Sequence, residues 1–175
     1  MKVLLVIDMQ NDFINGSLGS SAAEAIVDKV VEKMLNFDGT IICTKDTHML
    51  DYMNTLEGKK LPVPHCIYDT IGWQLNEKIE EARRKKSGDS ITKFTFGSLS
   101  LFEGLDFRSI ESLEICGLCT DICVVSNALI ARANFPDVPI TVDASCCAGT
   151  TPEKHKAALE VMKSCQIDVI NEVDS

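Results

Sequence analysis

The chain has 175 residues, of which 45% are hydrophobic and 25% are charged, and its formal net charge is −9. This length and composition are typical of a globular protein with one core, so we expect residues 1–175 to form a single domain. The negative charge argues against nucleic acid and against membrane surfaces as partners, because both attract basic faces.

The first apolar run, Val3–Ile7, ends at Asp8 and is too short for the core of a signal peptide. No other stretch approaches the ~20 apolar residues that span a bilayer. Several of the eight cysteines lie in or beside apolar runs, where free thiols pack like small hydrophobic side chains. We therefore expect a cytoplasmic protein whose cysteines are mostly reduced packing residues.

Short apolar runs alternate with longer amphipathic segments along the chain. The apolar runs predict buried strands, the third of them weaker than the rest, at Lys2–Asp8, Thr40–Thr44, Ser90–Lys93, Leu113–Gly117, Pro139–Val142 and Ile167–Ile170. The amphipathic segments predict helices at Ser21–Phe37, Trp73–Lys86, Asp121–Asn134 and Pro152–Ser164. The alternation predicts an α/β fold with three layers (α/β/α), in which helices cover both faces of a mainly parallel sheet of about six strands.

Polar residues stand where these strands end. Asp8 ends the first strand, Asp46 and His48 follow the second, Lys93 ends the third, and Cys119–Cys123 follow the fourth. Ligands of parallel α/β folds bind outside the carboxyl ends of the strands. We therefore expect these side chains to gather at one edge of the sheet.

Cys123 is the candidate nucleophile. It lies in the predicted first turn of a helix, with Thr120 or Asp121 as the expected N-cap. The positive end of the helix dipole would lower the pKa of a thiol there, and unpaired backbone N–H groups could hold an oxyanion, although a cysteine at such a position is often only a packing residue. Asp8 could take the thiol proton and return it to a leaving group, while Lys93 could stabilise the thiolate.

The segment Thr47–Ile71 lacks periodicity and is interpreted as an active-site loop. It carries His48 and His65, and with Asp46 these residues offer two imidazoles and a carboxylate, a set that suits a catalytic zinc, iron or manganese ion. Glu57 is a candidate for a further ligand. The alternative is a set of loop residues that only form hydrogen bonds.

Two other features carry weaker hypotheses. Cys116 and Cys119 form a CxxC motif, which a redox protein would place at the start of a helix. Cys116 falls inside a predicted strand, however, so we expect its side chain in the packed sheet. The third histidine, His155, falls in the last predicted helix, and we expect it on the surface.

Five short motifs are spread over nearly the whole chain: IDMQNDF at Ile7–Phe13, KDTH at Lys45–His48, PVPHC at Pro62–Cys66, TKF at Thr92–Phe94 and GLCTDICV at Gly117–Val124. Together they resemble the isochorismatase-like cysteine hydrolases, and within them the nicotinamidase (pyrazinamidase) group. Asp8, Lys93 and Cys123 match the catalytic triad of this family. The family has a cis peptide bond before the position of Cys119, and the backbone N–H groups of Cys119 and Cys123 match its oxyanion hole.

The resemblance also implies a cofactor. Asp46, His48 and His65 match the metal ligands of nicotinamidases, and Glu57 matches an additional ligand of some members. In nicotinamidases the ion binds the pyridine nitrogen, whereas isochorismatase-type members act without a metal and generally lack these histidines. Phe13 is expected to help wall the substrate ring. We therefore expect one divalent ion, with zinc ahead of iron or manganese.

The implied reaction is hydrolysis of a small amide, in which nicotinamide and water give nicotinate and ammonia through a thioester on Cys123. Family members are commonly oligomeric, so we expect a homo-oligomer. Two positions depart from the family pattern: residues 69–72 read Asp-Thr-Ile-Gly where many relatives carry Gly-Thr-x-Gly, and Cys119 replaces the usual alanine. The first leaves the shape of the substrate loop open. The second should be tolerated because the backbone N–H does the work.

Three alternatives remain at this point. The chain could be a hydrolase of the same family that acts on a ureido or carbamoyl compound. It could be a phospho-receiver signalling module, which also places Asp and Lys at strand ends but has no use for a histidine pair. It could also be a non-catalytic scaffold, in which case the complete triad would be a coincidence.

Overall fold

The computed structural model describes residues 1–103, 105 and 108–173. Within these ranges an entirely parallel six-stranded sheet has the strand order β3-β2-β1-β4-β5-β6. Its strands are β1 (Lys2–Ile7), β2 (Thr40–Asp46), β3 (Asp89–Lys93), β4 (Ser112–Leu118), β5 (Ile140–Ala148) and β6 (Asp168–Ile170). The predicted parallel α/β sheet is confirmed.

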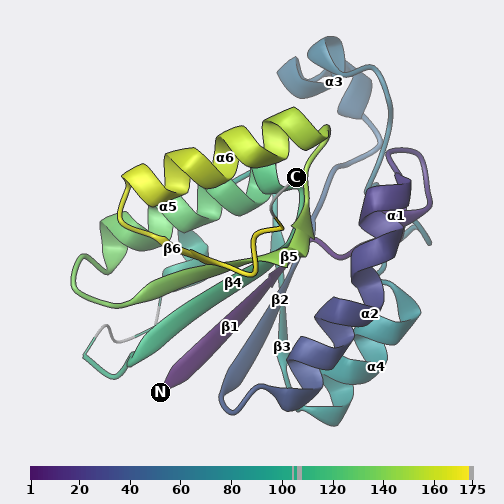
Figure 1. Cartoon of the computed structure of the whole chain (residues 1–175). Coiled ribbons are helices and arrows are strands. Elements are labelled where there is room, and N and C mark those ends of the chain that lie inside the picture. The colour runs from purple at the N-terminus through teal and green to yellow at the C-terminus, as the bar shows by residue number, and fades with distance from the viewer. Residues whose placement is uncertain (104, 106–107, 174–175) are drawn as a thin grey trace.

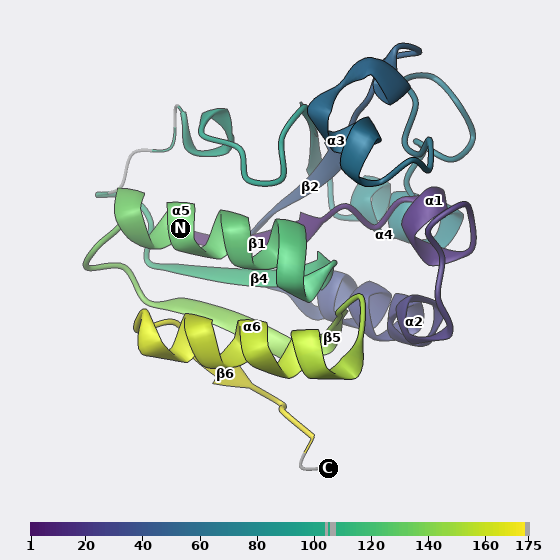
Figure 2. The ribbon, with the colours of Figure 1, turned by 90° about the horizontal axis from the view of Figure 1, so that it is seen from above.

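Helices cover both faces of this sheet, which gives the predicted three layers (Figure 1). One pair packs together on one face: α2 (Ser21–Asn36) and α4 (Glu77–Lys85). A second pair packs together on the other face, as the view from above shows (Figure 2): α5 (Val125–Asn134) and α6 (Pro152–Ser164). Shorter helical segments are α1 (Asn11–Ile14), η1 (Tyr52–Asn54), α3 (Leu56–Lys60), η2 (Ser100–Phe102) and the π-helical turn η3 (Thr120–Val124).

The position of each strand in the sheet explains how clearly its sequence predicted it. β1 lies at the centre, and residues Val3–Ile7 have no solvent exposure, so an unbroken apolar run marks it. β3 lies at an edge and is exposed at three of its five positions, which accounts for its weak signal. Ser20 and Thr151 cap α2 and α6 by accepting hydrogen bonds from the backbone of the first turn.

Several predicted elements have different bounds in the structure, and β5 and α4 show why. β5 runs six residues beyond the predicted end at Val142, because Asp143 lies inside the strand, where it is buried against Lys33 (2.7 Å) and breaks the apolar pattern. The helix predicted from Trp73 begins only at Glu77. Asn76 caps it by accepting a hydrogen bond from Lys78 N (3.1 Å), while Trp73 lies in the preceding turn.

The segment predicted as a loop, Thr47–Ile71, contains η1 and α3, which are too short to show periodicity. All eight cysteines are free thiols, as expected. No helix in the described ranges has both the length and the apolar character needed to cross a bilayer.

Candidate active site

The predicted meeting of polar side chains at the carboxyl edge of the sheet is confirmed. Asp8 directly follows β1, Asp46 is the last residue of β2, and Lys93 is the last residue of β3. Cys123 lies in η3, which follows β4. Because β2, β1 and β4 are neighbours in the sheet and β3 adjoins β2, their ends bring a thiol, two carboxylates and an ammonium into one small volume.

Lys93 connects the acid to the thiol. Its Nζ lies 2.7 Å from Asp8 Oδ2 and 3.5 Å from Cys123 Sγ. The Thr44 hydroxyl donates a hydrogen bond to Asp8 Oδ1 (2.6 Å), and Asp8 N donates one to that hydroxyl (3.1 Å). The three residues predicted to act together are therefore in contact through the lysine, and the carboxylate is held from its other side.

Burial dominates the proton affinities of this group. It raises the pKa of the Asp8 carboxyl, although Lys93 opposes the shift. It also raises the pKa of the Cys123 thiol well above its ordinary value, and the charge of Asp8 adds to this. For Lys93, burial would lower the pKa, but the negative charge of Asp8, with that of Asp46 beside it, outweighs burial and the pKa is raised.

The expected low pKa of Cys123 is therefore wrong for this structure. The sulfur lies in a side chain that is only 4% exposed, and the lack of water there disfavours the thiolate more than Lys93 favours it. The acid beside it also holds a proton more tightly than usual. A proton can thus pass from sulfur to carboxylate when the sulfur attacks a substrate.

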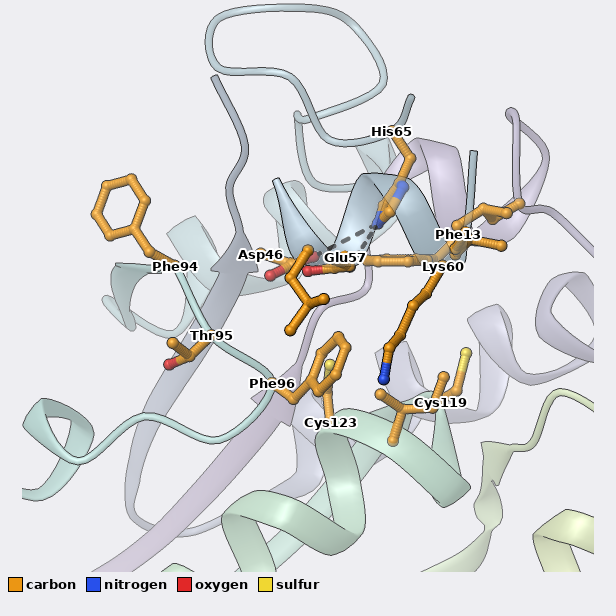
Figure 3. A pocket seen from close by; sticks show the side chains of 14 residues that line it. Phe13, Asp46, Glu57, Lys60, His65, Phe94, Thr95, Phe96, Cys119 and Cys123 are labelled. Carbon is orange, nitrogen blue, oxygen red and sulfur yellow. Dashed lines mark ion pairs between the residues drawn. The ribbon is translucent and has the colours of Figure 1, made fainter. Parts of the chain in front are cut away.

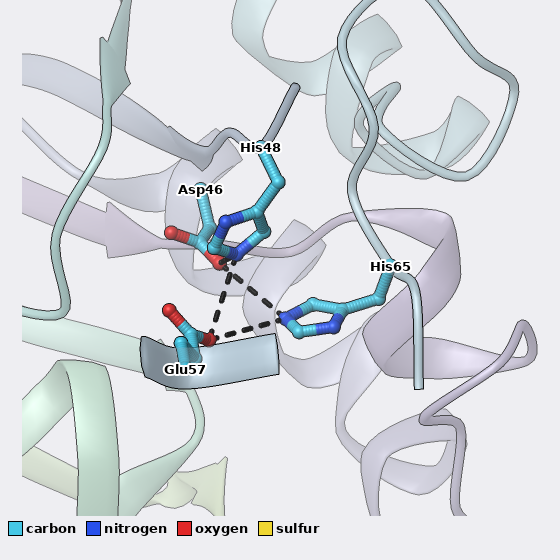
Figure 4. A group of neighbouring side chains, drawn as sticks. All are labelled: Asp46, His48, Glu57 and His65. Atoms are coloured by element: carbon cyan, nitrogen blue, oxygen red, sulfur yellow. Dashed lines mark hydrogen bonds and ion pairs between the residues drawn. The ribbon is translucent and has the colours of Figure 1, made fainter. Parts of the chain in front are cut away.

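Four other side chains form a candidate metal centre: Asp46, His48, Glu57 and His65. Their ligand atoms face one another and lie within 4.8 Å of each other (Figure 4). His48 Nε2 lies 3.1 Å from Asp46 Oδ2, and Glu57 Oε1 lies 3.6 Å from both His48 Nε2 and His65 Nε2. Tetrahedral ligands at ~2.1 Å from an ion are about 3.4 Å apart, so these spacings are compatible with one divalent ion held between the four side chains.

The orientation of His65 supports the same assignment. Its Nδ1 lies 2.8 Å from the backbone oxygen of Val63, which accepts the ring proton and leaves Nε2 as the ligand atom. Glu57 comes from α3, so the fourth member of the group depends on a helix that periodicity did not reveal.

Gln10 is a supporting residue that the sequence analysis did not single out. Its buried side-chain amide donates hydrogen bonds to the backbone oxygens of Asp46 and Trp73 (2.8 Å each). Its Oε1 accepts a hydrogen bond from Asp46 N (2.7 Å). Gln10 therefore fixes the backbone on both sides of the Asp46 side chain. Gln10 belongs to the IDMQNDF motif, which could have indicated that it has a role in the site.

Asn127 is a second supporting residue that the sequence analysis missed, and no motif pointed to it. It is fully buried, and its Nδ2 donates to the backbone oxygens of Cys123 (2.8 Å) and Phe96 (3.1 Å). Its Oδ1 accepts a hydrogen bond from Ser98 N (3.0 Å). Asn127 thus joins the cysteine-bearing turn to the segment that walls the pocket.

The thiol and three members of the candidate metal centre, Asp46, Glu57 and His65, line one pocket of about 460 Å³, within the range of small-molecule sites. Cys123 enters it from η3, whereas Asp46, Glu57 and His65 enter from the other side (Figure 3). Phe13 also lines it and packs against the His65 ring, with centroids 5.4 Å apart. The wall is completed largely by apolar and aromatic side chains, among them Leu18, Leu56, Leu61, Phe94, Phe96 and Ile122.

The start of η3 differs in part from expectation. The Leu118–Cys119 peptide bond is cis, as the resemblance implied. The N-cap is Cys119, however, and not Thr120 or Asp121, because those side chains bond to residues after β5. The two weaker hypotheses have different outcomes. Cys116 is buried within β4, as expected. His155, expected on the surface, is half-buried and hydrogen-bonded to Thr120.

The fold and the site thus define a parallel α/β protein with a buried thiol–carboxylate–ammonium group beside a four-residue candidate metal centre. The family model described as the isochorismatase domain matches residues 2–172. The chain belongs to the isochorismatase family. The buried, paired state of Asp8 also argues against the phospho-receiver alternative, which needs an accessible aspartate.

Relatives of known sequence cover nearly the whole chain. It is 27% identical to a nicotinamidase of Schizosaccharomyces pombe, over 98% of this chain and 93% of the relative. It is 31% identical to an uncharacterized isochorismatase family protein, PncA, of Bacillus subtilis, over 90% of this chain and 92% of the relative. The crystal structure of nicotinamidase PncA from Bacillus subtilis superimposes with a TM-score of 0.84 at 29% identity, covering 96% of this chain and 98% of that one.

Proposed function

We propose that the protein is a cysteine amidohydrolase that converts nicotinamide and water to nicotinate and ammonia through a thioester on Cys123. The observation that carries this proposal is the position of Lys93 between Asp8 and Cys123, 2.7 Å from the acid and 3.5 Å from the sulfur. The similarity to nicotinamidases supports the choice of substrate. The aromatic wall of the pocket suits a flat ring.

In the first half of the reaction, the Cys123 sulfur attacks the carboxamide carbon and its proton passes to Asp8. A carbon–sulfur bond forms and the carbonyl electrons move to oxygen. Lys93 balances the negative charge that moves between the sulfur and the carboxylate. In this proposal the backbone N–H groups of Cys119 and Cys123 hold the oxyanion.

In the second half, Asp8 gives its proton to the amide nitrogen, the carbon–nitrogen bond breaks, and ammonia leaves a thioester behind. Water then adds to the thioester carbon while Asp8 takes one of its protons. The carbon–sulfur bond breaks, the sulfur recovers a proton from Asp8, and nicotinate is released. The enzyme returns to its starting state.

Asp46, His48, Glu57 and His65 would hold one divalent ion, and a set of two imidazoles and two carboxylates suits zinc, iron or manganese. When bound, such an ion supplies a Lewis acid that can accept the ring nitrogen of the substrate. Elemental analysis of the purified protein distinguishes zinc from iron and manganese. The candidate metal centre also favours an aromatic amide with a ring nitrogen over a ureido or carbamoyl compound.

The direct test is ammonia release from nicotinamide by the purified protein, compared with Cys123→Ala and Asp8→Asn. We expect activity in the first and a loss of at least about 10³-fold in both variants, because each removes a member of a unit that acts together. Circular dichroism verifies that the variants are folded. Equal activity in all three proteins would reject the mechanism, and a preference for ureido compounds in the same assay would reject the substrate.

A further inference from the structure

His155 contacts the turn that carries the candidate nucleophile. Its Nδ1 lies 2.7 Å from the hydroxyl oxygen of Thr120, and the two atoms share a hydrogen bond. Thr120 has no solvent exposure and is the first residue of η3, three positions before Cys123. The bond therefore joins the first turn of α6 directly to η3, although 35 residues separate the two in sequence.

The position of His155 is itself fixed by its surroundings. Thr151 caps α6 by accepting a hydrogen bond from Lys154 N (3.2 Å). Gly149, the residue after β5, packs directly on the histidine: a Cβ at Gly149 would lie 2.8 Å from the Cβ of His155. A larger residue at position 149 would have to displace His155 and the first turn of α6, so this close packing depends on glycine.

The next residue of η3 is tied to the same segment. The Asp121 carboxylate accepts hydrogen bonds from Thr150 N (2.8 Å) and Thr150 Oγ1 (2.6 Å). Two successive residues of η3 are thus held by side-chain bonds to residues 150–155. Neither Thr120 nor His155 is among the described residues that line the pocket, so any effect of this pair on a bound substrate passes through η3.

We propose that His155 is a positioning residue for the nucleophile. Its bond to Thr120 holds η3 in place, and with it the Cys123 sulfur and the backbone N–H groups of Cys119 and Cys123. This inference depends on the proposed function in so far as Cys123 attacks the substrate. Small displacements of a reacting atom have large effects on rate, because the attack requires a narrow range of distance and angle.

A matched pair of variants tests the hydrogen bond separately from packing. In His155→Asn, the side-chain amide can place a polar atom near the position of the imidazole Nδ1 and keep the bond to Thr120. In His155→Leu, apolar bulk remains but the bond is lost. Lys154→Ala is the control, since its exposed side chain makes no hydrogen bond or ion pair with other described residues.

We expect His155→Leu to lower kcat for nicotinamide by about 10- to 100-fold, with KM and metal content close to those of the wild type. His155→Asn and Lys154→Ala should retain most of the activity. Thr120→Val should resemble His155→Leu, and the double variant should be no worse than either, because both remove the same bond. Wild-type kcat in His155→Leu, or equal losses in the Leu and Asn variants, would overturn the proposal.

A readout without substrate separates this inference from the proposed function. The rate of Cys123 alkylation by iodoacetamide, followed by peptide mass spectrometry, reports the placement of the sulfur directly. We expect alkylation of Cys123 to slow several-fold in His155→Leu and to be unchanged in His155→Asn. If nicotinamide proved not to be a substrate, this difference would still support the positioning role, and identical alkylation rates in both variants would contradict it.

Discussion

The Nζ atom of Lys93 lies 2.7 Å from Asp8 Oδ2, and neither side chain has any exposure to solvent. When one partner of a buried ion pair is removed, the other charge is left without water and without a counter-charge. The folded state is then strongly destabilised. Lys93 also approaches Asp46 Oδ1 at 3.4 Å. Lys93 therefore balances the charge of Asp8, beside the thiol, and that of Asp46, in the candidate metal centre.

Replacing this lysine should destabilise the fold. In Lys93→Met, Asp8 and Asp46 lose their buried cation, and we expect the free energy of unfolding in urea to fall by about 3 kcal/mol at neutral pH. The double variant Lys93→Met/Asp8→Asn should recover part of this lost stability, because it lacks one of the two uncompensated negative charges. An unfolding curve of Lys93→Met that coincides with that of the wild type would show that the pair does not contribute.

Gln10 should matter for metal binding. Gln10→Ala removes three hydrogen bonds that fix Asp46 and Trp73. Loss of such support around a ligand weakens metal affinity by about 10- to 100-fold. Competition with a chromophoric chelator measures this change. Gln74→Ala is the control because its side chain is exposed and makes no hydrogen bond to other described residues; an equal affinity in both variants would contradict the assignment.

Asp143 should make the stability depend on pH. Burial would raise the pKa of its carboxyl, but hydrogen bonds from Lys33, Ser145 and Asn171 outweigh burial and lower it. A carboxyl whose pKa is lower in the folded than in the unfolded state stabilises the fold at pH values above the unfolded pKa. This stabilisation is lost as the pH falls through the folded pKa.

We therefore expect Asp143→Asn to lower the free energy of unfolding by about 2 kcal/mol at pH 7. The difference from the wild type should shrink as the pH falls below 3.8, the ordinary pKa of the group. Asp38→Asn is the matched control, since Asp38 is exposed and its side chain makes no hydrogen bond or ion pair with other described residues. A difference between wild type and Asp143→Asn that stays constant from pH 7 to pH 3 would contradict this account.

The parts of the fold that could be predicted from sequence are those that follow from local patterns. Buried strands such as β1 are apolar runs in the sequence. The residue that ends each strand could be placed at the carboxyl edge of the sheet, because all strands of a parallel sheet end at the same edge. Asp8 and Lys93 were found in this way. The predicted end of β5 was too early, because Asp143 is buried with its partner Lys33 on α2 and no local pattern can show this pairing.

The supporting residues of the site were harder to predict for the same reason. Gln10 and Asn127 act through backbone atoms of distant segments, and the bond of His155 to Thr120 spans 35 residues. The pKa of Cys123 was predicted to be low from its position at the start of a helix, but the enclosure of the sulfur depends on the whole pocket. Burial is a property of the folded chain and outweighed the local effect.

The most direct test of the central claim is a search for the thioester on Cys123. The protein is mixed with excess nicotinamide, quenched in acid within a turnover, and examined by intact-mass and peptide mass spectrometry. The account predicts one nicotinoyl group on Cys123, which hydroxylamine removes, and none in Cys123→Ser. Release of nicotinate by an enzyme that forms no adduct, or by Cys123→Ser at the wild-type rate, would contradict it.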